Sequence, residues 1–293
     1  VDLAKWDARA EALGGNGHSL QAGLAARLAV HQGRALAADG TVGLIVPIND
    51  RTLEDTRANA VKLAYVRVDP THVAKDLTDT RTAVREALKV MREKPDEALA
   101  LLPLNPFVPK VAVRHSADLG VRLHRPTGVQ FQRRRPAHPV ASPGGAPAQQ
   151  VMLRGIDQRI TRGVLEERSG LLTVVSGRLN GKVTITVVGY QRCREHQAGV
   201  ARPVGRGLRG IRTHRGDRVS DRLAYIDQAT FLSMQATGRS QLVQYVWVYT
   251  HPVDMQRLRR FHRNVGHGFA GRLVEPSILP FGRIGGLPQP GRR

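Results

Sequence analysis

Apolar residues at helical spacing predict three helices in the first hundred residues. The first covers residues 2–13 and ends at Gly14-Gly15. The second begins at Ser19, which can cap it, and stops at Gly33. The third begins at Asp69-Pro70, an N-cap followed by a first-turn proline. The apolar positions expected to be buried are, helix by helix, Leu3, Trp6, Ala10 and Leu13; Leu20, Leu24 and Leu28; and Val73, Leu77, Val84, Leu88 and Met91.

Short apolar runs predict strands that alternate with these helices. Residues 42–48 and 60–68 have the composition of buried strands. Residues 171–179 and 182–188 flank Asn180-Gly181, which is a strong hairpin-turn signal. Helices that alternate with strands and are followed by a hairpin indicate a layered α/β domain.

The last quarter of the chain repeats both kinds of pattern. Residues 243–249 form an aromatic-rich alternating run, which predicts a strand. Asp254 can cap a following helix that carries Leu258, Phe261 and Val265.

Length and composition place the chain in a broad class. Its 293 residues, of which 41% are hydrophobic, can build one large domain or two ordinary ones. We find no apolar run of about 18 residues and no signal segment, and therefore expect a cytoplasmic protein. The single cysteine, Cys193, excludes a disulfide framework and a cysteine-based metal site, and it fits a reducing compartment.

The net charge of +21 is concentrated in two stretches. Residues 1–120 carry 16 Lys/Arg against 15 Asp/Glu. Residues 121–150 carry five arginines and no acid, and residues 192–220 carry eight arginines and two acids. Both stretches are rich in Arg with Pro or Gly and poor in apolar positions, so we expect them to be disordered. They are either basic linkers or the product of GC-rich DNA that is translated out of frame, and we favour the second interpretation.

Several motifs that occur in order resemble one enzyme family. The chain is similar to the C-terminal half of wax-ester synthase/diacylglycerol acyltransferase-type O-acyltransferases, with the nearest likeness to actinobacterial members. The segments that carry this resemblance are Leu13-Gly14-Gly15-Asn16 with Ser19-Leu20, Asp39 to Val42, Val46 to Arg51, Arg57 to Ala60, Val151 to Gly155 and Ser176 to Lys182. Between them the family has a Ser-Asn-x-Gly loop, and the stretch 121–150 takes its place here.

The end of the chain resembles the beginning of such a protein. Asp221 to Gln228 looks like its opening segment, and Pro280 to Arg283 resembles a later loop. The resemblance therefore implies a C-terminal half followed by a shortened N-terminal half.

This resemblance implies a fold and a division of the chain. The fold would be half of a two-subdomain, chloramphenicol-acetyltransferase-like (condensation-type) α/β structure with disordered basic linkers. Residues 1–120 would be the first part of the C-terminal half and residues 151–191 the hairpin that completes it. Residues 221–293 would be the truncated start of an N-terminal half. The linkers would be residues 121–150 and 192–220.

The family transfers a fatty acyl group from acyl-CoA to an alcohol or to diacylglycerol, without a further cofactor. Its HHxxxDG signature supplies a histidine general base. None of the 11 histidines of this chain is adjacent to another, and the one His-x-x-x-Asp match, His72 to Asp76, is followed by Leu77 and not by glycine. We therefore assign no catalytic residue, and expect His72 and Asp76 to face solvent.

Other residues have two interpretations each. Asn49, Arg51 and Asn59 match polar positions of the family and are candidates for lining an acyl tunnel, or they satisfy local backbone groups. The apolar, proline-broken residues 102–109 contact lipid or substrate, at the periphery of a membrane or lipid inclusion, or form a packed loop.

A basic cluster near the end of the chain also has two interpretations, of which we favour a solvated helix face. His262 and His267 lie near Arg259, Arg260 and Arg263, and this set contacts a phosphate such as that of CoA or is a solvated helix face. We find no metal-ligand spacing anywhere in the sequence.

Three hypotheses follow. The chain is an inactive remnant or fused fragment of a lipid O-acyltransferase, an acyltransferase completed by another chain, or an unrelated basic protein that binds nucleic acid. Against the third, the arginine-rich stretches lack interleaved aromatic residues and any binding module, so we expect no specific nucleic-acid partner.

The coding DNA tests the frameshift interpretation. Translated in another frame, the codons of residues 121–150 should give the Ser-Asn-x-Gly loop, and those of residues 192–220 should give a C-terminal helix of the family. Only stop codons and unrelated sequence in the other frames would show that the interpretation is wrong.

Overall fold

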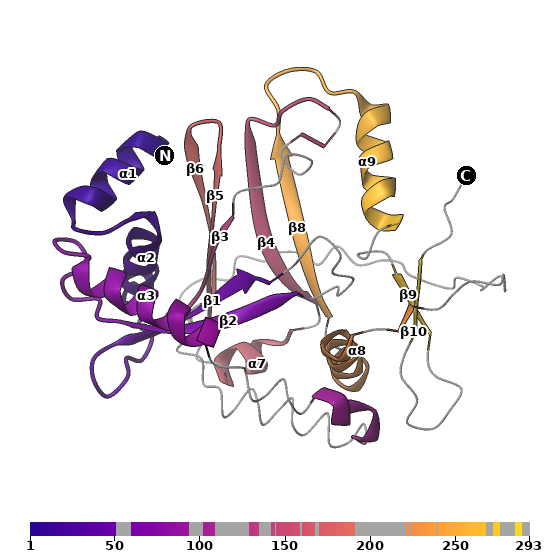
Figure 1. The fold of residues 1–293 in the computed structure, drawn as a ribbon, viewed down its shortest axis with the longest axis horizontal. Coiled ribbons are helices and arrows are strands. Elements are labelled where there is room, and N and C mark those ends of the chain that lie inside the picture. Colours follow the sequence, from indigo (N-terminus) through magenta and orange to yellow (C-terminus); the bar gives the residue numbers. More distant parts are fainter. Residues whose placement is uncertain are drawn as a thin grey trace.

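The structure is a computed structural model, and the chain is a mixed α/β protein (Figure 1). The residues that it describes are 1–50, 60–93, 102–108, 129–134, 142–143, 145–158, 160–167, 170–190, 221–222, 224–238, 240–267, 272–275 and 285–288.

The main element is a five-stranded sheet with the strand order β2-β1-β3-β5-β6. Its central strands β1 (Val42–Asn49), β3 (Val129–Arg134) and β5 (Leu171–Leu179) are parallel. The edge strands β2 (Val61–Val68) and β6 (Lys182–Tyr190) pair with them in antiparallel fashion. These strands confirm the predicted runs at residues 42–48 and 60–68.

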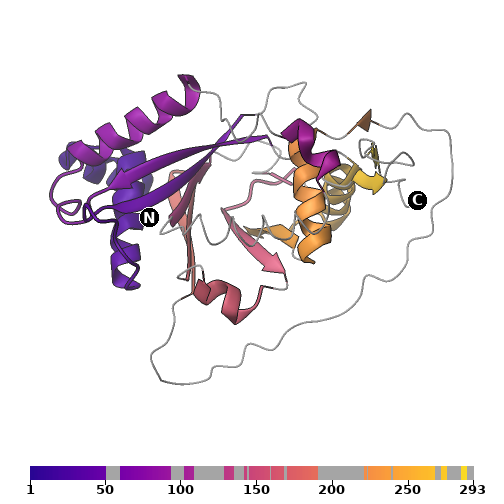
Figure 2. The same ribbon diagram turned by 90° about the horizontal axis from the view of Figure 1, so that it is seen from below.

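Three helices cover one face of this sheet: α1 (Leu3–Ala12), α2 (Gly17–His31) and α3 (Thr78–Glu93) (Figure 2). Every second residue of the strands points toward them, because side chains alternate across a sheet. The core between these layers consists of apolar residues from all of these elements, among them Val42, Leu44, Val46, Ala64, Val66, Val68, Leu172 and Val174.

Helix α2 differs from its prediction in its start and in its buried face. Asn16 is the N-cap, and Ser19 is the third helical residue: each side chain accepts a hydrogen bond from the other residue's backbone N–H, which forms a capping box. The predicted leucines are only partly buried, whereas Gly23 and four alanines are fully buried: Ala22, Ala25, Ala26 and Ala29. Small residues let the helix axis lie close to the sheet. Gly33, with φ 65°, follows the helix as predicted.

Helix α3 begins later than the sequence predicts. The side chain of Asp69 accepts a hydrogen bond from the backbone N–H of Thr71 and forms a turn. Asp76 does the same for Thr78, where the helix starts. The predicted core residues Val73 and Leu77 are buried, but they lie in the loop before the helix.

Strand β3 corrects the expectation that the whole of residues 121–150 is disordered. Residues 129–134 pair with β1 on one side and with β5 on the other. Their sequence, Val-Gln-Phe-Gln-Arg-Arg, alternates briefly, and the two flanking parallel strands provide hydrogen-bonding partners on both sides. The stretch 192–220 lies outside the described residues.

The rest of the chain forms a second layer beside the hairpin. Strand β4 (Gln150–Gln158) pairs over its full length with β8 (Ser240–Val248). Helix α9 (Met255–His267) follows, as predicted, with the carboxylate of Asp254 accepting hydrogen bonds from the N–H groups of Gln256 and Arg257. The pair β4–β8 joins the range 151–191 to the range 221–293.

The remaining elements are short or lie near the C-terminal end. They are α7 (Arg162–Glu167), α8 (Tyr225–Thr237), the 3₁₀ helix η1 (Leu102–Phe107) next to α8, and a small sheet of β7 (Asp221–Arg222), β10 (Gly285–Pro288) and β9 (Arg272–Glu275). In the described parts of the chain, we find no helix with the length and apolarity needed to cross a membrane.

The hairpin β5–β6 confirms its predicted turn. Asn180 has φ 49° and Gly181 has φ 68°, the left-handed conformations that a two-residue turn of this kind requires. The Asn180 side-chain amide also donates a hydrogen bond of 2.9 Å to the carbonyl of Ala148, which fixes the turn against the start of β4.

The corner between α1 and α2 gives a stability prediction. A Cβ atom on Gly15 would lie 2.5 Å from Ser19 Oγ and 2.7 Å from Leu77 Cβ, so Gly15→Ala should lower the free energy of unfolding by about 1–3 kcal/mol. The control is Gly163→Ala in α7, where a Cβ meets open space and helix propensity favours alanine. Urea unfolding measures both variants, and equal midpoints would contradict this packing.

Candidate functional site

The predicted tunnel residues lie at the end of the β1–β2 hairpin. Asn49 is the last residue of β1 and its side chain is exposed. The next residue, Asp50, closes the hairpin: its N–H donates to the carbonyl of Ala60, and its carboxylate lies 3.1 Å from Lys62 Nζ. Arg51 and Asn59 lie outside the described residues, so a tunnel at this position stays a prediction.

His72 and Asp76 are both exposed, but they do not lie on a helix as predicted. The Asp76 carboxylate accepts the backbone N–H of Thr78 at 2.8 Å. Hydrogen bonds from the hydroxyl and the backbone N–H of Thr78 lower the pKa of Asp76. Asp76 therefore holds the start of α3, and this pair has the geometry of a loop and not of a general base with its orienting carboxylate.

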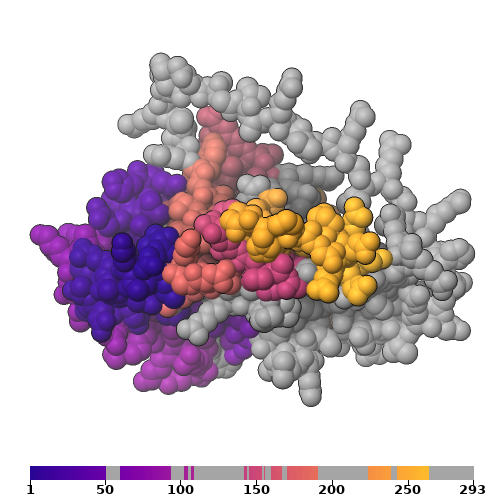
Figure 3. Space-filling model, turned by 90° about the horizontal axis from the view of Figure 1, so that it is seen from above, coloured from indigo at the N-terminus to yellow at the C-terminus, as the bar shows by residue number. Residues whose placement is uncertain are grey.

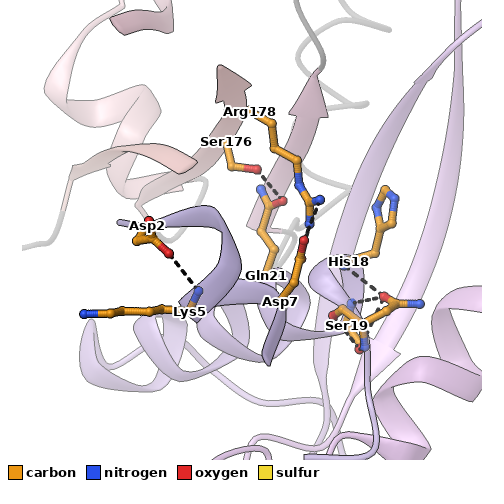
Figure 4. Close-up of polar contacts among 9 residues, drawn as sticks. Asp2, Lys5, Asp7, His18, Ser19, Gln21, Ser176 and Arg178 are labelled. Carbon is orange, nitrogen blue, oxygen red and sulfur yellow. Dashed lines mark hydrogen bonds and ion pairs between the residues drawn. The ribbon is translucent and has the colours of Figure 1, made fainter. Parts of the chain in front are cut away.

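A buried polar contact lies where α2 meets β5 (Figure 4). Ser176 Oγ donates a hydrogen bond of 2.7 Å to Gln21 Oε1, and both residues are buried. Gln21 comes from the helix face that carries the buried alanines, and Ser176 comes from the strand face that carries Leu172 and Val174. A buried polar group is tolerated when it is hydrogen-bonded, and this pair meets that condition.

This contact does not activate Ser176 as a nucleophile. An activated serine needs a base such as imidazole to take its proton, and an amide oxygen is not basic at neutral pH. The hydrogen bond instead fixes the axial position of α2 along β5. We therefore interpret Gln21 and Ser176 as a structural pair.

A second contact ties α1 to the same strand. Arg178 Nη1 donates to Asp7 Oδ2 at 2.9 Å, and Arg178 Nη2 donates to Asp7 Oδ1, so the guanidinium grips both carboxylate oxygens. The Arg178 side chain is 13% exposed and that of Asp7 is 44% exposed. Bidentate geometry and partial burial make this a stronger pair than an ordinary surface ion pair.

Sequence reasoning did not find these two pairs. Their members are separated by 155 and 171 residues, a distance over which periodicity carries no signal. Ser176 and Arg178 did belong to a segment that carried the family resemblance, which was the one available indication that they matter.

Among the residues that the structure describes, we find no group of three or more His, Cys, Asp or Glu side chains that could hold a metal ion.

Comparisons with known proteins add no identification. No protein-family model, no curated protein and no solved structure matches this chain.

The Asp7–Arg178 pair can be tested by removing one charge. Asp7→Asn leaves a largely buried guanidinium without its carboxylate, and should lower the free energy of unfolding by about 1–2 kcal/mol, since Asp7 itself is partly solvated. Glu86→Gln is the control, because it removes the same charge from an exposed pair 3.8 Å from Arg85. Urea unfolding should separate the two variants, and a control that loses as much stability would show that net charge, and not this pair, matters.

Proposed function

We propose that the chain derives from a lipid O-acyltransferase of the wax-ester synthase/diacylglycerol acyltransferase type, and that it performs no acyl transfer by itself. The observation that supports descent is that the family-like motifs sit at defined packing positions of one fold. Gly15 and Ser19 form the α1–α2 corner, and Ser176 and Arg178 bind α2 and α1.

The finer fold belongs to the same proposal. The five-stranded sheet with α1, α2 and α3 on one face would be half of a two-subdomain, chloramphenicol-acetyltransferase-like structure. On β2, Leu63 is 38% exposed and Tyr65 is 58% exposed, and they point away from the helices. An opposing subdomain would cover these side chains, since exposed apolar residues on a sheet face favour a partner layer.

The proposed lack of activity follows from the absence of the histidine motif that would supply the general base. The sequence contains no adjacent pair of histidines, and His72 with Asp76 forms a solvent-exposed loop. Without a base to take the hydroxyl proton, the rate of acyl transfer from acyl-CoA to an alcohol or diacylglycerol falls by a factor of about 10²–10⁴. The parent enzyme would use acyl-CoA as substrate.

Peripheral lipid contact remains part of this proposal. Leu104 and Phe107 of η1 are exposed, and through such side chains the proline-broken segment would meet a membrane or a lipid inclusion.

A second candidate function is an acyltransferase that is completed by another chain carrying the histidine motif. The exposed Leu63 and Tyr65 favour it, because they offer the surface on which such a chain would dock. A measurement of turnover by the chain alone separates this candidate from an enzyme that is active by itself.

The decisive assay measures CoA release by the purified chain with a long-chain acyl-CoA and either hexadecanol or diacylglycerol. We expect no rate above the uncatalysed background, and a His72→Ala variant should behave identically. A rate above background would overturn the proposed inactivity. Activity that appears only when a histidine-containing N-terminal half is added, and that falls with Tyr65→Lys, would establish the second candidate instead.

A further inference from the structure

Helix α9 presents a basic outer face. Arg259, Arg260 and Arg263 are exposed and occupy positions i, i+1 and i+4, so that Arg259 and Arg263 lie one turn, about 6 Å, apart. The 13 residues of the helix include four arginines and no Asp or Glu. The segment that ends in α9 is at the surface in the view from above, where it is coloured gold (Figure 3).

The opposite face of α9 is already in use. Leu258 and Phe261 are half-buried, and the Phe261 ring meets Trp247 of β8 edge to face with centroids 6.2 Å apart. Trp247 in turn stacks on Tyr245 at 5.6 Å. These contacts fix the rotation of the helix, so its arginine face is turned outward by packing.

Asp254, just before the helix, pairs with Arg257 of the first turn, and its charge also reaches Arg260. Asp254 lies 3.4 Å from Arg257, and its pKa is lowered mainly by the backbone N–H of Arg257, with smaller contributions from the charges of Arg257 and Arg260. Arg259 and Arg263 lie further along the helix. The charge of the outer face is therefore concentrated and directed at solvent.

We propose that Arg259, Arg260 and Arg263 bind the phosphate backbone of a nucleic-acid duplex without reading its sequence. A duplex carries about one charge per 1.7 Å of its axis, so arginines one helical turn apart each find a phosphate. The net charge of +21 on the whole chain attracts the same polyanion over a longer range. The contact needs no stacked bases, and so no aromatic residues.

Charge complementarity and packing favour a duplex over a membrane. An interfacial helix binds lipid by inserting its apolar face, and on the apolar face of α9 the Phe261 ring lies against Trp247. Among the side chains of α9 that the structure describes, the exposed apolar one is Met255, at the first turn. Three arginines on a rigid face can release counterions from a duplex, whereas Phe261, on the opposite face, packs against Trp247 and does not point to a bilayer.

The salt dependence of binding tests this assignment. The full chain and a triple variant, Arg259→Gln, Arg260→Gln and Arg263→Gln, are titrated with a labelled mixed-sequence duplex between about 50 and 200 mM salt. Each lost phosphate contact should reduce the slope of log K against log salt by about 0.9, so the triple variant should lose about 2–3 units of slope. The control triple variant changes three exposed arginines of α3 by the same total charge: Arg81→Gln, Arg85→Gln and Arg92→Gln.

The control variant should keep nearly the full slope, and a second duplex sequence should bind equally well. An equal loss of slope in both triple variants would overturn the proposal, because it would show an effect of net charge alone. Binding to phosphatidylserine vesicles that depends on the three arginines, with no such dependence for the duplex, would overturn it in favour of a lipid surface. Urea unfolding of each variant confirms that all are folded.

Discussion

The close seating of α2 on the five-stranded sheet is the contact on which the rest of the structure depends. Four alanines on the buried face let the helix axis approach the sheet, and Gly23 leaves room for Val73 and Leu77 of the loop before α3. A larger residue at these positions would separate the two layers and open a gap that the surrounding side chains could fill only in part. Both neighbouring helices take their places from this one: α1 joins it through the Gly14-Gly15 corner, and Leu77 packs against that corner just before α3.

The polar contacts in this interface fix the positions of α1 and α2 relative to the sheet. Hydrophobic contact alone would allow α2 to slide along the sheet, whereas the bond between Gln21 and Ser176 has one position of optimal length. The pair of Asp7 and Arg178 fixes α1 in the same way. These side chains come from segments that resemble an acyltransferase or from helices that pack against them. The proposed descent rests on where these segments pack, and it is independent of any present activity.

Much of this scaffold could be predicted from local signals. The runs of β1 and β2, the Asn180-Gly181 turn and the Asp254 cap of α9 each depend on neighbouring residues, and the structure has all of them. The start of α3 was misplaced because Asp69-Pro70 and Asp76 are competing cap signals, and the loop between them is held by the burial of Val73 and Leu77.

Other features depend on residues far apart in the sequence. The placement of β3 between β1 and β5 is set by parallel pairing with strands distant in the chain, which leaves only a weak trace in its own sequence. Leucines were expected on the buried face of α2, but the short distance to the sheet selects alanine there. For the candidate site, Asn49 follows the predicted strand at residues 42–48 and is the last residue of β1, whereas the contacts of Gln21 and Asp7 required the fold.

Amide hydrogen exchange in α2 tests the central role of this helix most directly. If α2 holds the layers together, the amides of Ala25, Ala26 and Ala29 should exchange only through global unfolding, with the same opening free energy as those of Leu172 and Val174 in β5. Exchange of the α2 amides at a much lower opening free energy, while β1 and β5 stay protected, would contradict this account, because the sheet would then be stable without the helix.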